Sequence, residues 1–154
     1  MEIIPATPAH LESIIEIWKD FMDYHALIDP FFTRSENGHE SFRRYVTGEI
    51  PKDDSFLFVC IDNGLCIGYI LGNKSTYPPV FKKSHYCQIS DIAVLPKYRR
   101  KGIGEKFLAC VKVWAKEREL DRIELRVVAS NQLAYSFYRK HGFKDYLHNL
   151  FLEI

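Results

Sequence analysis

Hydrophobic positions along the chain follow two different periods, which predict a domain that contains both helices and strands. Between Leu11 and Met22 the apolar residues recur every three or four positions, which is typical of an amphipathic helix. The same spacing returns between Ile103 and Ala115. Short apolar or alternating runs such as Ser55–Asp62 and Arg122–Val128 instead indicate strands.

The order of these segments predicts the fold class. The expected strands are Glu2–Ala6, Ser55–Asp62, Leu65–Gly72, Tyr86–Val94, Arg122–Val128 and two short segments within Phe143–Ile154. The expected helices are Pro8–Tyr24, His39–Thr47, a long one that follows Gly102 and ends near Glu119, and Asn131–His141. Asn63-Gly64 predicts a tight hairpin turn, because both of its residues need positive φ. Hairpin-linked strands come first and strand–helix alternation follows, so we predict an α/β fold with a mixed central sheet, flanked by helices. Its N-terminal half is antiparallel and a parallel crossover lies in its second half.

Composition narrows the class of protein. The chain has 154 residues, of which 47% are hydrophobic and 27% charged, so we expect one globular domain over residues 1–154. The net charge of +1 gives no overall attraction to nucleic acid or to a membrane surface. No leader-like N-terminus or long apolar span is present, and we expect a cytoplasmic protein. The four cysteines lack metal-ligand spacing, so we expect free thiols and no metal site; Cys87 is nearest the chemistry described below.

A basic, glycine-containing turn between Leu95 and Gly104 is the strongest chemical signal in the sequence. The first N–H groups of a helix lack partners within the helix and carry positive potential, so they attract anions. Gly102 and Gly104 would let a phosphate approach the backbone closely. The P-loop pattern G-x-x-x-x-G-K-[ST] is absent. The dinucleotide-binding fingerprint G-x-G-x-x-G also fails, because Phe107 stands where its third glycine would be. A solvated surface turn is the alternative that these residues alone leave open.

Two motifs resemble one known family. The first is Arg99-x-x-Gly102-x-Gly104, preceded by Asp91-Ile92-Ala93-Val94 and Pro96-Lys97-Tyr98. The second is Asn131-x-x-Ala134-x-x-Phe137-Tyr138-x-x-x-Gly142-Phe143. Together they resemble the GNAT family of N-acetyltransferases, whose members have the acyl-CoA N-acyltransferase fold. The resemblance covers nearly the whole chain and is weakest over roughly the first fifty residues.

The resemblance implies acetyl-CoA as cosubstrate and a primary amine of a small molecule or peptide as acceptor, joined by direct attack in a ternary complex. The implied CoA-binding residues are Ile92, Ala93, Val94, Arg99, Arg100, Lys101, Gly102, Ile103, Gly104, Glu105, Asn131, Ala134 and Tyr138. A backbone N–H on the strand before the turn would polarise the thioester carbonyl.

The resemblance also makes Tyr138 the general acid that protonates the departing thiolate, a role that suits a phenol with a pKa near 10. The general base stays open. Polyamine acetyltransferases carry a glutamate at the position of Ser90, which can at most order a water, and Glu124, His25 and His85 are further candidates. Asp91 is adjacent, but strand alternation would point it to the opposite face.

The acceptor pocket is expected from the N-terminal part of the chain and the loop before the active strand. Its candidates combine aromatic faces with a carboxylate, which suits a cationic amine; they are Tyr24, His25, Asp29, Phe32 and Tyr77, with Phe31 and Phe81 nearby. Ordinary core packing is the competing explanation for the aromatic residues. The C-terminal strand is a candidate surface for a homodimer. A CoA-binding regulatory module without catalysis is the alternative function, and one basic turn is thin support for a nucleic-acid binder.

Overall fold

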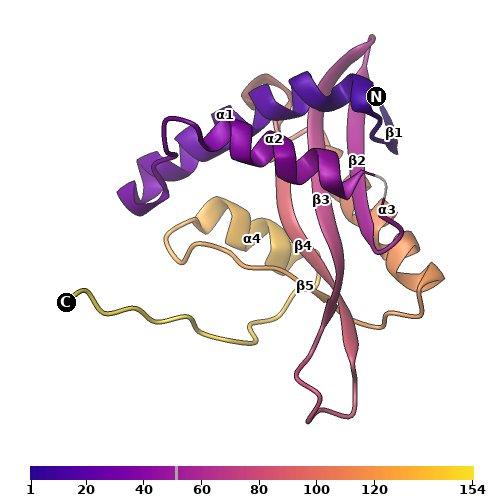
Figure 1. Cartoon of the computed structure of the whole chain (residues 1–154), viewed down its shortest axis with the longest axis vertical. Coiled ribbons are helices and arrows are strands. Elements are labelled where there is room, and N and C mark those ends of the chain that lie inside the picture. Colours follow the sequence, from indigo (N-terminus) through magenta and orange to yellow (C-terminus); the bar gives the residue numbers. More distant parts are fainter. Residues whose placement is uncertain (51) are drawn as a thin grey trace.

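A single five-stranded sheet, with strands in the order β1-β2-β3-β4-β5, organises the molecule (Figure 1). The computed structural model describes residues 1–50 and 52–154. The strands are β1 (Glu2–Pro5), β2 (Ser55–Asp62), β3 (Leu65–Thr76), β4 (His85–Val94) and β5 (Ile123–Glu124). The first three pairings are antiparallel and the β4–β5 pairing is parallel. The predicted fold class, a mixed sheet with a parallel crossover in its second half, is therefore confirmed.

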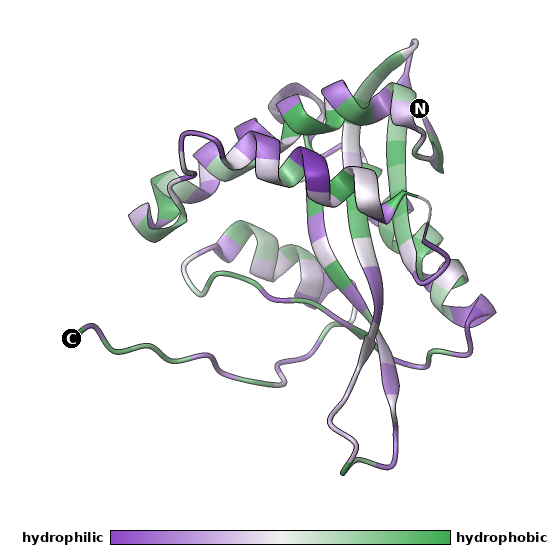
Figure 2. Cartoon of the chain, in the orientation of Figure 1, coloured by the Kyte–Doolittle hydropathy of each residue, from purple (hydrophilic) through white to green (hydrophobic). Residues whose placement is uncertain are grey.

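Helices cover both faces of the sheet. They are α1 (Leu11–Ile28), α2 (Gly38–Glu49), α3 (Ile103–Glu117) and α4 (Gln132–Lys140), with short 3-10 turns η1 (Pro8–His10), η2 (Pro30–Phe32) and η3 (Pro96–Tyr98). On one face α1 and α2 pack on a core that includes Val59, Tyr69 and Leu71. On the other face α3 inserts Phe107 and Trp114 between the side chains of the sheet. Figure 2 shows hydrophobic residues along the part of the sheet that the helices cover, and a mixture of hydrophobic and hydrophilic residues on the helices. Among the described residues, no helix is long and apolar enough to cross a membrane.

The hairpin between β2 and β3 forms where the sequence predicts it. Asn63 has φ 49° and Gly64 has φ 79°, so both turn residues adopt the left-handed conformation that this pair tolerates. This turn fixes the antiparallel pairing of the two central strands.

Two elements, α1 and β3, extend well beyond their predicted C-terminal ends. Helix α1 continues to Ile28 and stops only at Asp29, because the residue before a proline disfavours helical backbone and Asp29 is extended. As a result His25 lies in the last helical turn rather than in a connection. Strand β3 continues through polar residues to Thr76, because Lys74, Ser75 and Thr76 pair with the start of β4. Pairing with β4 therefore makes these residues part of the strand although their polar composition does not favour one.

The C-terminal part is less regular than predicted. The expected strand Arg122–Val128 keeps only Ile123–Glu124, and the described residues 143–154 contain no strand. Apolar side chains such as Leu150 and Phe151 are 92% and 86% exposed. Alternating apolar residues suit a segment to a sheet, but a strand also needs a neighbouring strand to pair with. With only two residues, β5 is too short to serve as that neighbour.

Candidate active site

The turn between β4 and α3 bends sharply through two left-handed residues. Arg100 has φ 59° and Gly102 has φ 77°. The Arg99 side chain stabilises this path, because its Nε donates a hydrogen bond to the Val94 carbonyl at 2.9 Å. Its guanidinium also lies 5.2 Å from the centre of the Tyr24 ring on α1. Arg99 thus joins the end of β4, the basic turn and α1.

The N-terminus of α3 has the features of an anion site. Gly102 is its N-cap residue, and no side chain caps this helix end within the described chain. The amides of Ile103, Gly104 and Glu105 therefore lack side-chain acceptors, as the sequence analysis requires. A Cβ atom built on Gly102 would meet nothing within 4 Å, so the space in front of the helix is open. The exposed Arg100 and Lys101 flank it. These features fit the diphosphate of CoA.

Gly104 also has a role in packing, in addition to the predicted approach of a phosphate, which stays a prediction. A Cβ atom at this position would lie 2.8 Å from Cζ of Phe137 on α4, which is too close for a real contact. The small residue therefore allows α4 to pack against the start of α3. The two sequence motifs, about thirty positions apart, meet at this contact.

Helix α4 buries the predicted general acid. Asn131 caps the helix by accepting a hydrogen bond from the Ala134 amide at 3.1 Å. Tyr138 is only 8% exposed and packs between Phe137 and Phe143, at ring distances of 5.2 and 5.5 Å. Burial, with a smaller contribution from the charge of Asp91, raises the pKa of Tyr138 well above its usual value. The phenol therefore stays protonated at neutral pH, as an acid must.

Strands β4 and β5 separate immediately after they pair. Their pairing joins Cys87 to Ile123 and Gln88 to Glu124, and no further pair follows within the described residues. The edge of β4 from Ile89 to Val94 is consequently free of a strand partner on the side of β5 (Figure 1). The backbone of Ile92, Ala93 and Val94, predicted to contact the pantetheine arm, lies along this free edge.

A β-bulge interrupts β4 beside this edge. Leu71 pairs with Asp91 and Gly72 pairs with Ile89, so Ser90 is an extra residue between them. Ile89 and Ile92 both join the core under α3 although three positions separate them. On the other face Asp91 contacts Tyr69, while Ser90 lies beside Tyr45 of α2. The prediction that Asp91 points away from the face of Ser90 is therefore wrong, because the bulge breaks the alternation.

Asp91 lies within a group of titratable side chains. The Tyr69 hydroxyl donates a hydrogen bond to Oδ2 of Asp91 at 3.2 Å. Burial raises the pKa of Asp91 to about 6, against the opposing effects of this hydrogen bond and of the nearby His25. Tyr138 is close enough for Asp91 to raise its pKa. Sequence analysis missed Tyr69 and set Asp91 aside, although the three-residue spacing of Ile89 and Ile92 signals a bulge.

The predicted acceptor residues separate into two groups. Tyr24, His25 and Phe32 lie together at the end of α1. The centre of the His25 ring is 5.9 Å from that of Tyr24 and 6.1 Å from that of Phe32. Asp29 is used locally, where its carboxylate accepts the Phe31 amide at 3.0 Å. Tyr77 belongs elsewhere, at the base of the β3–β4 hairpin.

Around Tyr77 a second polar cluster forms at the β4–β5 junction. The Tyr77 hydroxyl donates to Glu124 at 2.5 Å, and Arg122 lies 2.8 Å from the same carboxylate oxygen. Tyr77 also stacks on Tyr86 at 4.4 Å. Burial, followed by the hydrogen bond to Glu124, raises the pKa of Tyr77 to about 12. Glu124 is therefore already engaged by two protein groups.

Two other candidates lie away from the free edge of β4 or are unsuited to react. His85 is six residues before Asp91 on β4, about 20 Å along an extended strand. Burial raises the pKa of the Cys87 thiol to about 12, so this cysteine is protonated and weakly nucleophilic at neutral pH.

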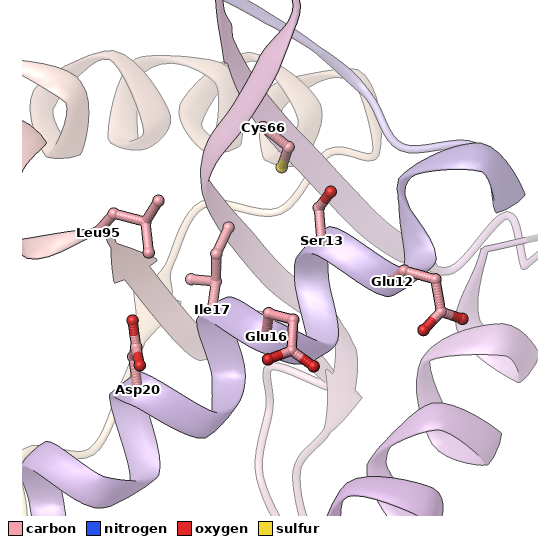
Figure 3. Close-up of a pocket in the computed structure, with 7 residues that line it drawn as sticks. All are labelled: Glu12, Ser13, Glu16, Ile17, Asp20, Cys66 and Leu95. Carbon is pink, nitrogen blue, oxygen red and sulfur yellow. The ribbon is translucent and has the colours of Figure 1, made fainter.

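A groove of about 340 Å³ runs beside α1, near the end of β4 (Figure 3). It is lined by Glu12, Ser13, Glu16, Ile17, Asp20, Cys66 and Leu95. Three carboxylates on the α1 wall would repel a diphosphate, so the groove does not suit the donor.

Comparison with known proteins identifies the family. The model of the acetyltransferase (GNAT) family matches residues 12–143. An N-alpha-acetyltransferase of Sulfurisphaera tokodaii is 34% identical over 115 residues, which cover 69% of this chain and 67% of the relative. Among solved structures, a mutant protein of Bacillus halodurans has a TM-score of 0.88 at 22% identity, covering 100% of this chain and 99% of its own. A predicted acetyltransferase of Clostridium acetobutylicum, solved with acetyl-CoA, has a TM-score of 0.80 at 21% identity and covers 99% and 95%.

The chain therefore belongs to the GNAT family, the class of acetyl-CoA-dependent N-acetyltransferases, as its two motifs predict.

Proposed function

We propose that this protein transfers the acetyl group of acetyl-CoA to a primary amine by direct attack in a ternary complex. The observation that carries the proposal is the open, uncapped N-terminus of α3 beside a free edge of β4, with Tyr138 buried alongside. An anion site, an exposed strand edge and an acid in one place are the parts that thioester aminolysis needs.

On the donor side, the amides that open α3 hold the CoA diphosphate, and Arg100 and Lys101 add positive charge. Arg99 keeps the turn in shape through its bond to the Val94 carbonyl. The free edge of β4 at Ile92–Val94 aligns the pantetheine arm, and Asn131 and Ala134 flank it from the start of α4. A backbone N–H of this edge stabilises the oxyanion that forms when the amine attacks.

Tyr138 gives its proton to the sulfur as the C–S bond breaks. The raised pKa of this tyrosine keeps its hydroxyl protonated and available as a donor at neutral pH, while it also makes the hydroxyl a weaker acid than an ordinary phenol. Ser90 and Glu124 remain proposals for the base or for a group that positions water. Glu124 is held by Tyr77 and Arg122, which argues for a structural role.

For the acceptor we propose the α-amine of a peptide as the first class to test, because the Sulfurisphaera relative is an N-alpha-acetyltransferase. Small-molecule amines are the second class. Tyr24, His25 and Phe32 offer an aromatic wall at the end of α1, and Tyr77 with Glu124 offers a polar one at the β4–β5 junction.

The test is release of free CoA thiol from acetyl-CoA in the presence of peptides with different N-termini and of small amines. We expect thiol release that depends on both the enzyme and the amine, with the acetylated product detected by mass spectrometry. Tight CoA binding without thiol release for any amine would support the regulatory module instead.

A further inference from the structure

The bulge in β4 places two consecutive polar side chains on the same face of the sheet. In a regular strand Ser90 and Asp91 would point in opposite directions. Here the extra residue Ser90 lets Asp91 face the side of α1 and α2, directly beside the edge that β5 leaves free. The Asp91 carboxylate therefore lies beside the free edge of β4, on the face of the sheet that α1 and α2 cover.

Four neighbouring elements each bring one titratable group near Asp91. His25 comes from α1, Tyr45 from α2, Tyr69 from β3 and Tyr138 from α4. Only His25 among these can carry a positive charge, and its Nδ1 is 2.8 Å from the Phe21 carbonyl. Within the described chain, Tyr69 is the hydrogen-bond donor to the carboxylate. The Tyr69 hydroxyl thus orients the carboxylate through Oδ2, and its other oxygen has no hydrogen-bond partner among the described residues.

We propose that Asp91 is the general base of the transfer: its carboxylate takes a proton from the acceptor ammonium, and Tyr69 holds it in position. The inference rests on the proposed function and deepens it by assigning the group that the sequence left open. Asp91 lies close enough to Tyr138 for its charge to raise the pKa of that tyrosine, so the proposed proton acceptor and proton donor are near each other.

The proton balance follows from this arrangement. Asp91 takes one proton from the ammonium, and the neutral amine attacks the carbonyl carbon so that a C–N bond forms. The C–S bond then breaks, and Tyr138 gives its proton to the departing sulfur. Tyr138 regains a proton from the nitrogen of the new amide, and Asp91 releases its own to solvent. One ammonium and one thioester give one amide, one thiol and one proton.

Asp91 suits this role better than the candidates from the sequence. Ser90 has no proton-accepting group of useful basicity. Glu124 is already engaged by the Tyr77 hydroxyl and the Arg122 guanidinium. The pKa of Asp91, raised to about 6 by burial, makes it a stronger base than an ordinary aspartate while it is still mostly ionised at neutral pH.

The first experiment compares the pH dependence of kcat/KM for wild type and Asp91→Asn. For wild type we expect activity to fall as the pH decreases through about 6, because protonated Asp91 accepts no proton. In Asp91→Asn we expect the rate at pH 8 to fall by about 100-fold or more and this acidic limb to disappear. Asp62→Asn, a partly buried aspartate at the end of β2, is the matched control and should keep the limb.

A second variant tests the positioning role of Tyr69. In Tyr69→Phe the carboxylate loses the hydrogen bond that lowers its pKa. We expect the acidic limb to move to higher pH, with much of the activity recovered in alkaline buffer. A purely structural role for Tyr69 would lower the rate without moving the limb.

Thermal unfolding supplies a readout that does not need activity. The folded-state pKa of Asp91, about 6, lies above its ordinary value of 3.8, so its ionisation lowers stability as the pH rises from about 4 to about 6, and the full cost is present above that range. We therefore expect Asp91→Asn to raise the melting temperature at pH 8 and the gain to shrink at pH 4. If the ionised Asp91 instead stabilised the fold, Asp91→Asn would lower the melting temperature at pH 8.

The outcomes separate the two levels of the proposal. No thiol release by wild type with any amine overturns both the proposed function and the base. An active wild type whose acidic limb persists in Asp91→Asn overturns Asp91 alone, as does a limb that disappears in Glu124→Gln instead.

Discussion

The two ends of the functional part of β4 are built in different ways. After Val94 the chain forms the donor end, where local sequence determines the geometry: two left-handed residues, an arginine that bonds back to its own strand, and a helix start. At Ser90 and Asp91 it forms the acceptor end, where a bulge depends on pairing with β3. Short-range signals thus describe the proposed site of the cosubstrate, whereas long-range packing creates the proposed site of proton transfer.

This difference affects how each end tolerates change. The donor end depends on backbone conformation and charge, so a substitution there should affect binding without unfolding the sheet. The acceptor end depends on close packing between strands, so a substitution there should lower the stability of the whole domain.

The largest expected effect is at the donor end. Gly102→Glu places a side chain and a negative charge in the open space before α3, and we expect CoA affinity to fall by more than about 1000-fold, or about 4 kcal/mol. Calorimetric titration measures it. The matched control is Gly64→Glu, since Gly64 also has positive φ and open space but lies in the β2–β3 hairpin. Equal loss of affinity in both variants would contradict the anion site.

Removal of the Tyr138 hydroxyl tests the proposed general acid. We expect Tyr138→Phe to lower kcat by about 100-fold while CoA affinity stays nearly unchanged, because the ring still packs between Phe137 and Phe143. Single-turnover kinetics and titration with CoA separate the two quantities. A fully active variant would remove the acid assignment.

A smaller effect is expected at the acceptor end. A Cβ atom on Gly72 would lie 2.1 Å from the Gln88 carbonyl oxygen and 2.3 Å from Cζ of Phe56, so Gly72→Ala must distort the strands beside the bulge. We expect a loss of about 1–3 kcal/mol in the free energy of unfolding, measured with denaturant. Gly48→Ala is the control, because Gly48 lies in α2 with nothing within 4 Å and alanine favours a helix. If Gly72→Ala were as stable as wild type, the bulge would not depend on that close approach.

The smallest expected effect concerns Arg99. In Arg99→Gln the hydrogen bond to the Val94 carbonyl is lost, and we expect the free energy of unfolding to fall by about 0.5–1.5 kcal/mol, as for one hydrogen bond. CoA affinity should weaken only several-fold, since the amides of α3 remain. A loss as large as that of Gly102→Glu would mean that Arg99 itself provides most of the binding.

Sequence patterns predicted most of the fold because its main signals are local. The Asn63-Gly64 turn, the glycine turn before α3 and the Asn131 cap all depend on a few adjacent residues. The patterns failed where a partner decides the structure. Polar residues at the end of β3 became strand because β4 pairs with them, and the apolar residues near Leu150 formed no strand without a partner.

The same limit explains the candidate site. Tyr138 was proposed from its motif, but Asp91 was set aside because alternation was assumed to continue through β4. The acceptor residues were grouped by type and proximity in sequence, yet Tyr24 lies against Arg99 whereas Tyr77 binds Glu124 on the other side of β4. Only the register of the sheet reveals these placements.

The contact between Gly104 and Phe137 has an evolutionary consequence. Because a methyl group at position 104 would occupy the space of the Phe137 ring, residue 104 cannot become larger unless the ring at position 137 moves or is replaced. Among relatives we expect a larger residue at position 104 to be accompanied by a smaller or differently shaped one at position 137. Ancestral lineages should therefore have changed these positions together or in rapid succession.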